Sequence, residues 1–121
     1  MKNNYFVRCA CYEKMGEHIV VVDPKSPRVI TLDPWLEVIF AAADGQRTVE
    51  QFIEKLKTQY AGGAPVGLEE QTLQLMQKLL AEGLIRLTDL PTQLPYYLSM
   101  PVAQQDKERA LVEMKKDGYI K

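Results

Sequence analysis

The hydrophobic pattern of the chain changes its period at Asp33–Pro34, and this change constrains the fold more than any other feature. Before it, three short runs are rich in β-branched and aromatic residues and are separated by turn-forming residues: 5–12, 18–22 and 28–32. Runs of this length and composition predict strands. Because the connections at Met15–Glu17 and Asp23–Pro27 are brief, we expect an antiparallel meander.

Beyond this point apolar residues recur every three or four positions, which predicts helices. Asp33 can cap the first helix and Pro34 suits its first turn, while Asp44–Gly45 is expected to end it. Its apolar face is expected to comprise Trp35, Leu36, Ile39, Phe40 and Ala43. Strands followed by helices predict the α+β class.

Two more helices follow. A capping-box pattern at Thr48–Gln51 opens the second, and Gly62–Gly63 is expected to stop it. Its apolar stripe is Val49, Phe52, Ile53, Leu56 and Tyr60. The third is predicted over residues 68–82, with Gly83 as a left-handed cap. Residues 84–87 fit either a short strand or a packed extension of this helix.

The third helix carries a wider apolar arc than a surface helix needs. We expect its core stripe to be Thr72, Leu75, Met76 and Leu79. Leu73 and Leu80 lie on a neighbouring face, next to Gln77. Two explanations remain open at this stage. The helix is buried on two sides, for example by the C-terminal segment, or its second apolar face forms a groove that takes a ligand.

The strand predicted at 28–32 supplies a second candidate surface. If it lies at the edge of its sheet, its free N–H and C=O groups are a template for another strand. A peptide that adds there gains main-chain hydrogen bonds, and side-chain pockets set its specificity. The alternative is an edge that the protein's own C-terminal tail covers.

The C-terminal third differs in composition. Prolines at positions 91, 95 and 101 do not fit a helix interior or a central strand. We expect an extended linker that Tyr96–Leu98 holds against the domain. A last helix is predicted from Pro101 to Lys116, with only a thin apolar stripe, and Gly118 is expected to end it.

Composition argues against several functional classes. A net charge of −1 gives no bulk attraction to nucleic acid or anionic membrane. No apolar run has the length of a signal peptide or a membrane helix, and free thiols at Cys9 and Cys11 fit a reducing cytosol. This cysteine pair lacks the second pair that a zinc site needs, and the lone His18 fits a structural strand residue. We therefore expect no catalytic residue, no metal and no cofactor.

Three segments together resemble the PqqD-like family of precursor-peptide recognition elements: 29–35, 43–52 and 79–85. The similarity lies in the order of a strand, a helix with a tryptophan, an Asp-Gly turn before a threonine, and a third helix ending in Gly-Leu. It covers roughly the first 87 residues. The resemblance implies an α+β fold, in which a three-stranded antiparallel sheet precedes a three-helix, winged-helix-like bundle, here with an extra C-terminal helix. It divides the chain into a peptide-binding domain, 1–88, and a proline-rich linker with a helix, 89–121.

The resemblance also implies a function without catalysis. Members of the family bind the leader segment of a ribosomally made precursor peptide and hand it to a modifying enzyme, often a radical-SAM protein. The leader lies between the third strand and the third helix. Carried onto this chain, the peptide-binding residues are Arg28, Val29, Ile30, Thr31, Leu32, Leu73, Gln77 and Leu80. The Tyr5–Tyr12 strand and the tail from Leu90 depart from the family pattern, and the tail could cover the groove, dimerise or dock the enzyme.

Two other functions remain open. A winged-helix regulator would place the third helix in DNA, but this helix carries three glutamates against the single Lys78, so DNA binding through it is not expected. A basic patch of Lys14, Lys25 and Arg28 is the remaining route to DNA. The other alternative is a structural homodimer whose edge strands pair with each other.

Overall fold

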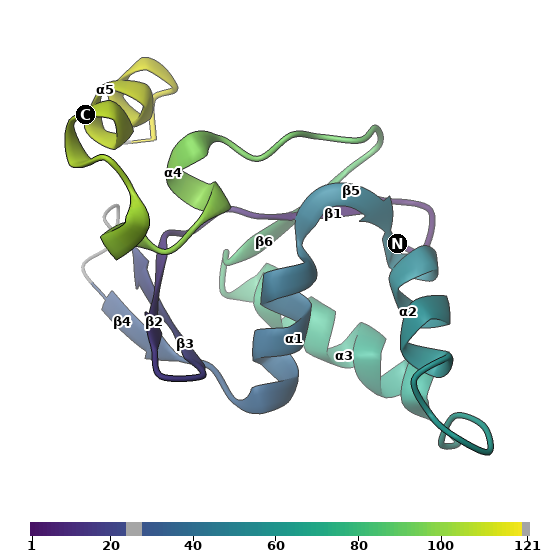
Figure 1. The fold of residues 1–121 in the computed structure, drawn as a ribbon. Coiled ribbons are helices and arrows are strands. Elements are labelled where there is room, and N and C mark those ends of the chain that lie inside the picture. Colours follow the sequence, from purple (N-terminus) through teal and green to yellow (C-terminus); the bar gives the residue numbers. More distant parts are fainter. Residues whose placement is uncertain (24–27, 120–121) are drawn as a thin grey trace.

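A computed structural model describes residues 1–23 and 28–119 of the chain (Figure 1). The first half contains β1 (Tyr5–Arg8), β2 (Tyr12–Met15), β3 (His18–Asp23), β4 (Arg28–Thr31), α1 (Pro34–Ala42) and β5 (Asp44–Thr48). The second half contains α2 (Val49–Lys57), α3 (Leu68–Ala81), β6 (Ile85–Thr88), α4 (Tyr96–Ser99), the 3-10 turn η1 (Val102–Gln104) and α5 (Lys107–Lys116). The α+β class is confirmed. Most of the predicted loop at Asp23–Pro27 lies outside the described residues.

The strands form two antiparallel sheets where the sequence predicted one. One sheet has the order β2-β3-β4, and the other has the order β5-β1-β6. The single strand predicted at 5–12 is wrong, because it divides between the sheets. The N–H of Cys9 donates to the carbonyl of Leu84 beside the second sheet, whereas the carbonyl of Cys11 accepts from Val22 in the first. The three residues between β1 and β2 therefore carry the chain from one sheet to the other.

Both partners of β1 come from later in the chain. β6 pairs with it in the register Tyr5↔Thr88 to Arg8↔Ile85, which makes residues 85–88 a strand and not a helical extension. β5 occupies the segment that was expected only to end the first helix. Its Gly45 has φ 76°, and a Cβ there would clash with the carbonyl of Thr92. This close approach joins β5 to the segment after β6 through the Thr92 N–H and the Gly45 carbonyl, 2.8 Å apart.

The helices follow their local signals closely. The Asp33 carboxylate accepts from the Leu36 N–H at 3.0 Å and caps α1. The capping box at Thr48–Gln51 is confirmed at the start of α2, which ends at Lys57, before the predicted glycines. α3 is confirmed over nearly its predicted range, and Gly83 after it has φ 74°. Trp35 departs from the expected core face of α1, because its side chain is 50% exposed.

The tail builds a second hydrophobic cluster beside the main core. Its buried members are Cys11, Tyr97, Leu98, Ala110, Met114 and Tyr119. The last helix starts at Lys107 and not at Pro101, because Asp106 caps it by accepting from the Arg109 N–H. The N–H of Ala103 in the tail donates to the Glu13 carboxylate on β2. The tail therefore lies beside β2, which is the edge strand opposite β4 in this sheet.

Candidate functional site

β4 is an edge strand whose outer side has no strand partner within the described residues. It pairs only with β3, in the register Val20↔Thr31 to Asp23↔Arg28. The Leu32 N–H donates to the carbonyl of Ile19 across this ladder. Hydrogen-bonding direction alternates along an antiparallel strand. The N–H and C=O groups of Ile30 therefore point to β3, and those of Val29 and Thr31 point to the free edge.

A groove runs beside this edge, between β4 and the C-terminal half of α3. We call it the strand-edge groove. Its volume is about 320 Å³, and it is lined by Ile30, Thr31, Leu32, Asp33, Leu36, Lys78, Leu79, Glu82 and Leu84. One wall continues from β4 into α1, and the other is α3 with the residues after it. The groove lies on the side of β4 to which Ile30 and Leu32 point, because Leu32 is buried in the core and Ile30 packs against it.

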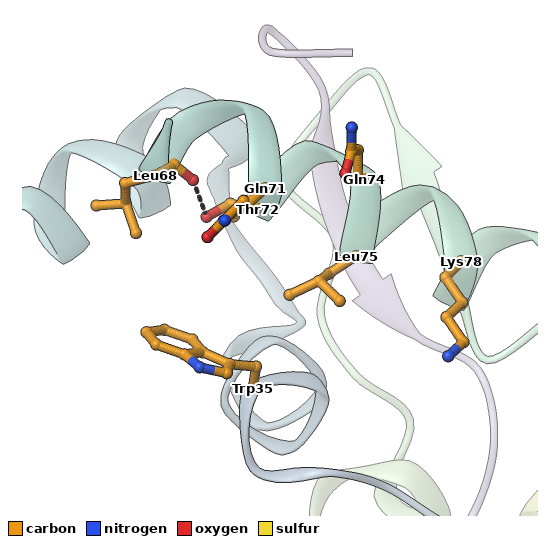
Figure 2. Close-up of a pocket in the computed structure, with 7 residues that line it drawn as sticks. All are labelled: Trp35, Leu68, Gln71, Thr72, Gln74, Leu75 and Lys78. Carbon is orange, nitrogen blue, oxygen red and sulfur yellow. Dashed lines mark hydrogen bonds between the residues drawn. The ribbon is translucent and has the colours of Figure 1, made fainter. Parts of the chain in front are cut away.

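A second cavity continues this groove along α3 toward the start of that helix (Figure 2). This Trp35 pocket has a volume of about 420 Å³ and is lined by Trp35, Leu68, Gln71, Thr72, Gln74, Leu75 and Lys78. Figure 2 shows the indole of Trp35 on α1 facing Leu68 and Leu75 on α3 across the cavity. The hydroxyl of Thr72 donates to the Leu68 carbonyl at 2.7 Å, which satisfies the buried polar group of this wall.

Lys78 lines both cavities and marks where they meet. In the part of the chain that the structure describes, no carboxylate forms an ion pair with its ammonium group. Of the described side chains, Lys78 is the one charged group that lines the mainly apolar Trp35 pocket, whereas Asp33 and Glu82 line the strand-edge groove beside it. A ligand carboxylate is therefore favoured on the side of Lys78 that faces the Trp35 pocket.

The predicted site residues divide into two groups. Ile30, Thr31 and Leu32 line the strand-edge groove, and Val29 lies on the same strand with its side chain 71% exposed. Arg28 belongs to β4, but its side chain lies outside the described residues, as does Lys25 of the patch considered for DNA.

The residues expected on α3 do not join this group. Neither cavity is lined by Leu73, Gln77 or Leu80. Leu73 and Leu80 are half-buried against the main core. At about 100° per residue they lie on one side of the core stripe, whereas β4 and α1 lie on the other. The wide apolar arc of α3 is thus explained by packing on that side, and any contact of these residues with a peptide stays a prediction.

The face of α3 that meets the groove carries residues that the sequence reasoning missed. Gln71, Leu75, Lys78 and Glu82 recur at intervals of four, three and four along this helix. Leu75 was expected in the core stripe; it is half-buried against the main core and also lines the Trp35 pocket. The helical spacing could have identified the face, but only the packed structure shows that it turns toward β4.

Among features that would point to catalysis, a metal site or a membrane segment, the lone histidine has a structural role in the fold. His18 lies 3.2 Å from the Glu37 carboxylate, which also accepts from the Ile19 N–H and so joins α1 to β3. Among the described residues, no group of three histidine, cysteine or acidic side chains is placed to hold a metal ion. Within the same residues, every helix is too short or too polar to span a bilayer.

One of three comparisons with known proteins gives a match. A sequence model of the family described as coenzyme PQQ synthesis protein D (PqqD) matches residues 18–85, which is more than half of the chain. This segment contains β3, β4 and α1 to α3, the elements that form both cavities. No curated protein and no solved structure matches the chain. The family match nevertheless covers the whole groove, and the chain belongs to the coenzyme PQQ synthesis protein D (PqqD) family.

Proposed function

We propose that this protein binds a ribosomally made precursor peptide as an added strand on β4 and presents it to a modifying enzyme. The observation that carries the proposal is the free edge of β4 beside a groove that contains both apolar and charged side chains. The family description connects the chain with synthesis of coenzyme PQQ, and the resemblance of its sequence to precursor-peptide recognition elements implies a peptide ligand. In this role the protein is an accessory binding component, and the chemistry belongs to the partner enzyme, for which a radical-SAM protein is our candidate.

Main-chain pairing alone does not account for useful affinity. Val29 and Thr31 offer about four hydrogen-bonding groups, each contributing roughly 0.5–1.5 kcal/mol net. Association costs roughly 4 kcal/mol or more in lost rigid-body freedom, which offsets most of this gain. Each apolar side chain buried in a pocket contributes about 1.5–3 kcal/mol. The side chains that enter the strand-edge groove and the Trp35 pocket must therefore supply the net affinity.

The groove also defines what the peptide should look like. Alternate residues of an added strand point to the same side, so every second side chain can enter the strand-edge groove. The ligand then passes Lys78, where a carboxylate is favoured, and places a large apolar side chain beside Trp35. We expect an extended segment with alternating apolar residues, an acidic residue, and a further large apolar residue.

A titration with short peptides encoded beside this gene tests the proposal. Amide NMR shifts should concentrate at Val29–Leu32, which form the strand edge and one wall of the groove, and at Leu75 and Lys78, which line the cavities on α3. Trp35 is the single tryptophan, so its fluorescence should report filling of the Trp35 pocket without a label. Absence of shifts with every such peptide would count against peptide binding.

The same free edge can also pair with β4 of a second copy. Sedimentation measured alongside the titration separates the two cases. Growth of the mass with protein concentration, together with protected Val29 and Thr31 amides in the peptide-free protein, would favour the structural homodimer.

A further inference from the structure

The outer face of α1 is apolar where a surface helix is normally polar. The exposed residues of this helix are Pro34, Trp35, Val38 and Ala41, and none of them is polar. Val38 is 44% exposed. The only charged residue of α1 is Glu37, and its carboxylate accepts from the Ile19 N–H at 2.9 Å, against β3. Charge is thus absent from the solvent-facing side of the helix.

A third cavity borders this face on the side of α2. We call it the α1–α2 cleft. Its volume is about 450 Å³, and Val38, Ala41 and Ala42 of α1 form one wall. Buried Phe52 and Leu56 of α2 contribute apolar surface to the other. The cleft shares no lining residue with the strand-edge groove or with the Trp35 pocket.

The spacing on α1 fits a helical partner. Ala41 and Ala42 lie three and four positions after Val38, as on a helix face that packs against another helix. Alanines at positions 41 and 42 let the backbone of such a helix approach closely, because interaxial distance depends on the side chains at the contact.

The charges around the cleft identify the chemistry of that partner. Arg47 and Lys55 line it, and within the described residues neither forms an ion pair. The one acidic lining residue, Asp44, already accepts from the Gln46 N–H at 3.0 Å. Glu50 and Glu54 lie on the opposite side of α2, where their negative charges attract the ammonium group of Lys2. The cleft therefore presents two cations and one hydrogen-bonded carboxylate, and this net positive charge favours an acidic ligand over a basic one.

We propose that the outer face of α1 and the α1–α2 cleft dock an amphipathic helix of a partner protein whose apolar stripe is flanked by acidic residues. The apolar stripe covers Val38 and Ala41, and the flanking carboxylates meet Arg47 and Lys55. Val38, Ala41 and the cleft share no lining residue with the two peptide cavities, so both ligands bind at the same time. A protein that carries a peptide to another protein needs two such surfaces.

The test uses two synthetic 15-residue helical peptides added to the full chain. Each has leucines at helical spacing; one has glutamates beside the leucines and the other has lysines at the same positions. We expect the glutamate peptide to shift the amides of α1 and α2 and to leave those of β4 unshifted. The lysine peptide should bind at least ten-fold more weakly.

Charge reversal on α2 supplies the matched control. Lys55→Glu should weaken binding of the glutamate peptide by about five-fold or more, since it replaces one attraction with a repulsion. The same variant should strengthen binding of the lysine peptide. Lys57 lies in the same helical turn as Lys55 but outside the cleft, so Lys57→Glu should leave the affinities for both peptides unchanged. Ala41→Glu, at an exposed position, should abolish binding while the NMR spectrum stays folded.

Three results would overturn the proposal. The first is absence of shifts in α1 and α2 at millimolar glutamate peptide. The second is equal loss of affinity in Lys55→Glu and Lys57→Glu, which would indicate non-specific attraction. The third is concentration-dependent shifts of α1 without any peptide, which would assign the face to a second copy of the chain.

Discussion

Arg8 connects three separate segments through its guanidinium, and the residue as a whole is only 6% exposed. Its Nε donates to the Leu98 carbonyl at 2.7 Å, and its two terminal nitrogens donate to the carbonyls of Ser99 and Ala41. It also stacks over the ring of Tyr12. Burial lowers the pKa of Arg8, yet an arginine stays protonated at any ordinary pH. One side chain thus fixes the tail to β1 and to the end of α1.

We expect Arg8→Lys to lower the free energy of unfolding by about 2–4 kcal/mol, because one ammonium does not reach all three carbonyls. Urea denaturation with far-UV circular dichroism measures this change. Arg86→Lys is the matched control, since Arg86 is an exposed strand residue and its replacement should have little effect. Equal stability of the Arg8→Lys variant and the unmodified protein would contradict the role given to Arg8.

At the scale of elements, β4 and α3 determine the site by the direction in which each presents its groups. β4 presents the N–H and C=O groups of Val29 and Thr31 to its free edge. α3 presents Leu75 and Lys78 to the cavities, while Leu73 and Leu80 pack on its other side. Substitutions at neighbouring positions should therefore have opposite consequences for stability and binding.

On β4 we expect Thr31→Pro to weaken binding of a precursor peptide at least ten-fold with a small loss of stability. It removes an edge N–H, and proline is tolerated at sheet edges. Ile30→Pro instead removes a hydrogen bond to β3 and should lower the free energy of unfolding by about 1–3 kcal/mol. Thr31→Val keeps the N–H and should bind normally. Calorimetric titration and urea denaturation separate these outcomes, and full binding by Thr31→Pro would exclude strand addition.

On α3 the exposed neighbours Gln77 and Lys78 distinguish the two faces of the helix. Lys78→Glu should weaken binding of an acidic precursor peptide by about ten-fold, because it reverses the charge where the two cavities meet. Gln77→Glu adds the same charge one residue earlier and should leave affinity nearly unchanged. Fluorescence titration on Trp35 measures both. A larger loss of affinity in Gln77→Glu than in Lys78→Glu would instead indicate that the peptide binds the face of α3 that carries Leu73, Gln77 and Leu80.

At the scale of the whole molecule, two hydrophobic clusters are joined near β1 and β2. The main core lies among the helices and both sheets, and the second cluster packs the tail on Cys11. Tyr97 lies in the second cluster, where its hydroxyl donates to the Asp117 carboxylate at 3.0 Å. Burial, with a smaller contribution from this hydrogen bond, raises the pKa of Tyr97 to about 12.

The raised pKa of Tyr97 predicts that the stability of the tail depends on pH. A phenol with a raised folded pKa stabilises the fold fully below its unfolded pKa of about 10, and this stabilisation is lost as pH rises toward the folded value. We expect thermal stability to fall between about pH 10 and 12, with loss of tail NMR signals before those of α1 to α3. Tyr97→Phe should remove this part of the pH dependence. An unchanged pH profile in that variant would exclude Tyr97 as its cause.

The sequence by itself determined the features that depend on neighbours within about four residues. The Asp33 cap, the capping box at Thr48–Gln51 and the left-handed Gly83 were all predictable, because the groups that satisfy one another are close in the chain. The family resemblance was also carried by local segments, and the match over residues 18–85 confirms it.

Only the tertiary structure decided which distant segments meet. The run at 5–12 reads as one strand until β5 and β6 pair with its first half and β3 with the strand that follows. The polar residues of β5 gave no strand signal, because their pairing with β1 arises from a partner about forty positions away. The face of α3 that turns toward β4 likewise follows from how α1 and both sheets pack around it. Periodicity along one helix identifies its apolar sides, but the neighbours on each side are fixed by contacts between elements that are far apart in the chain.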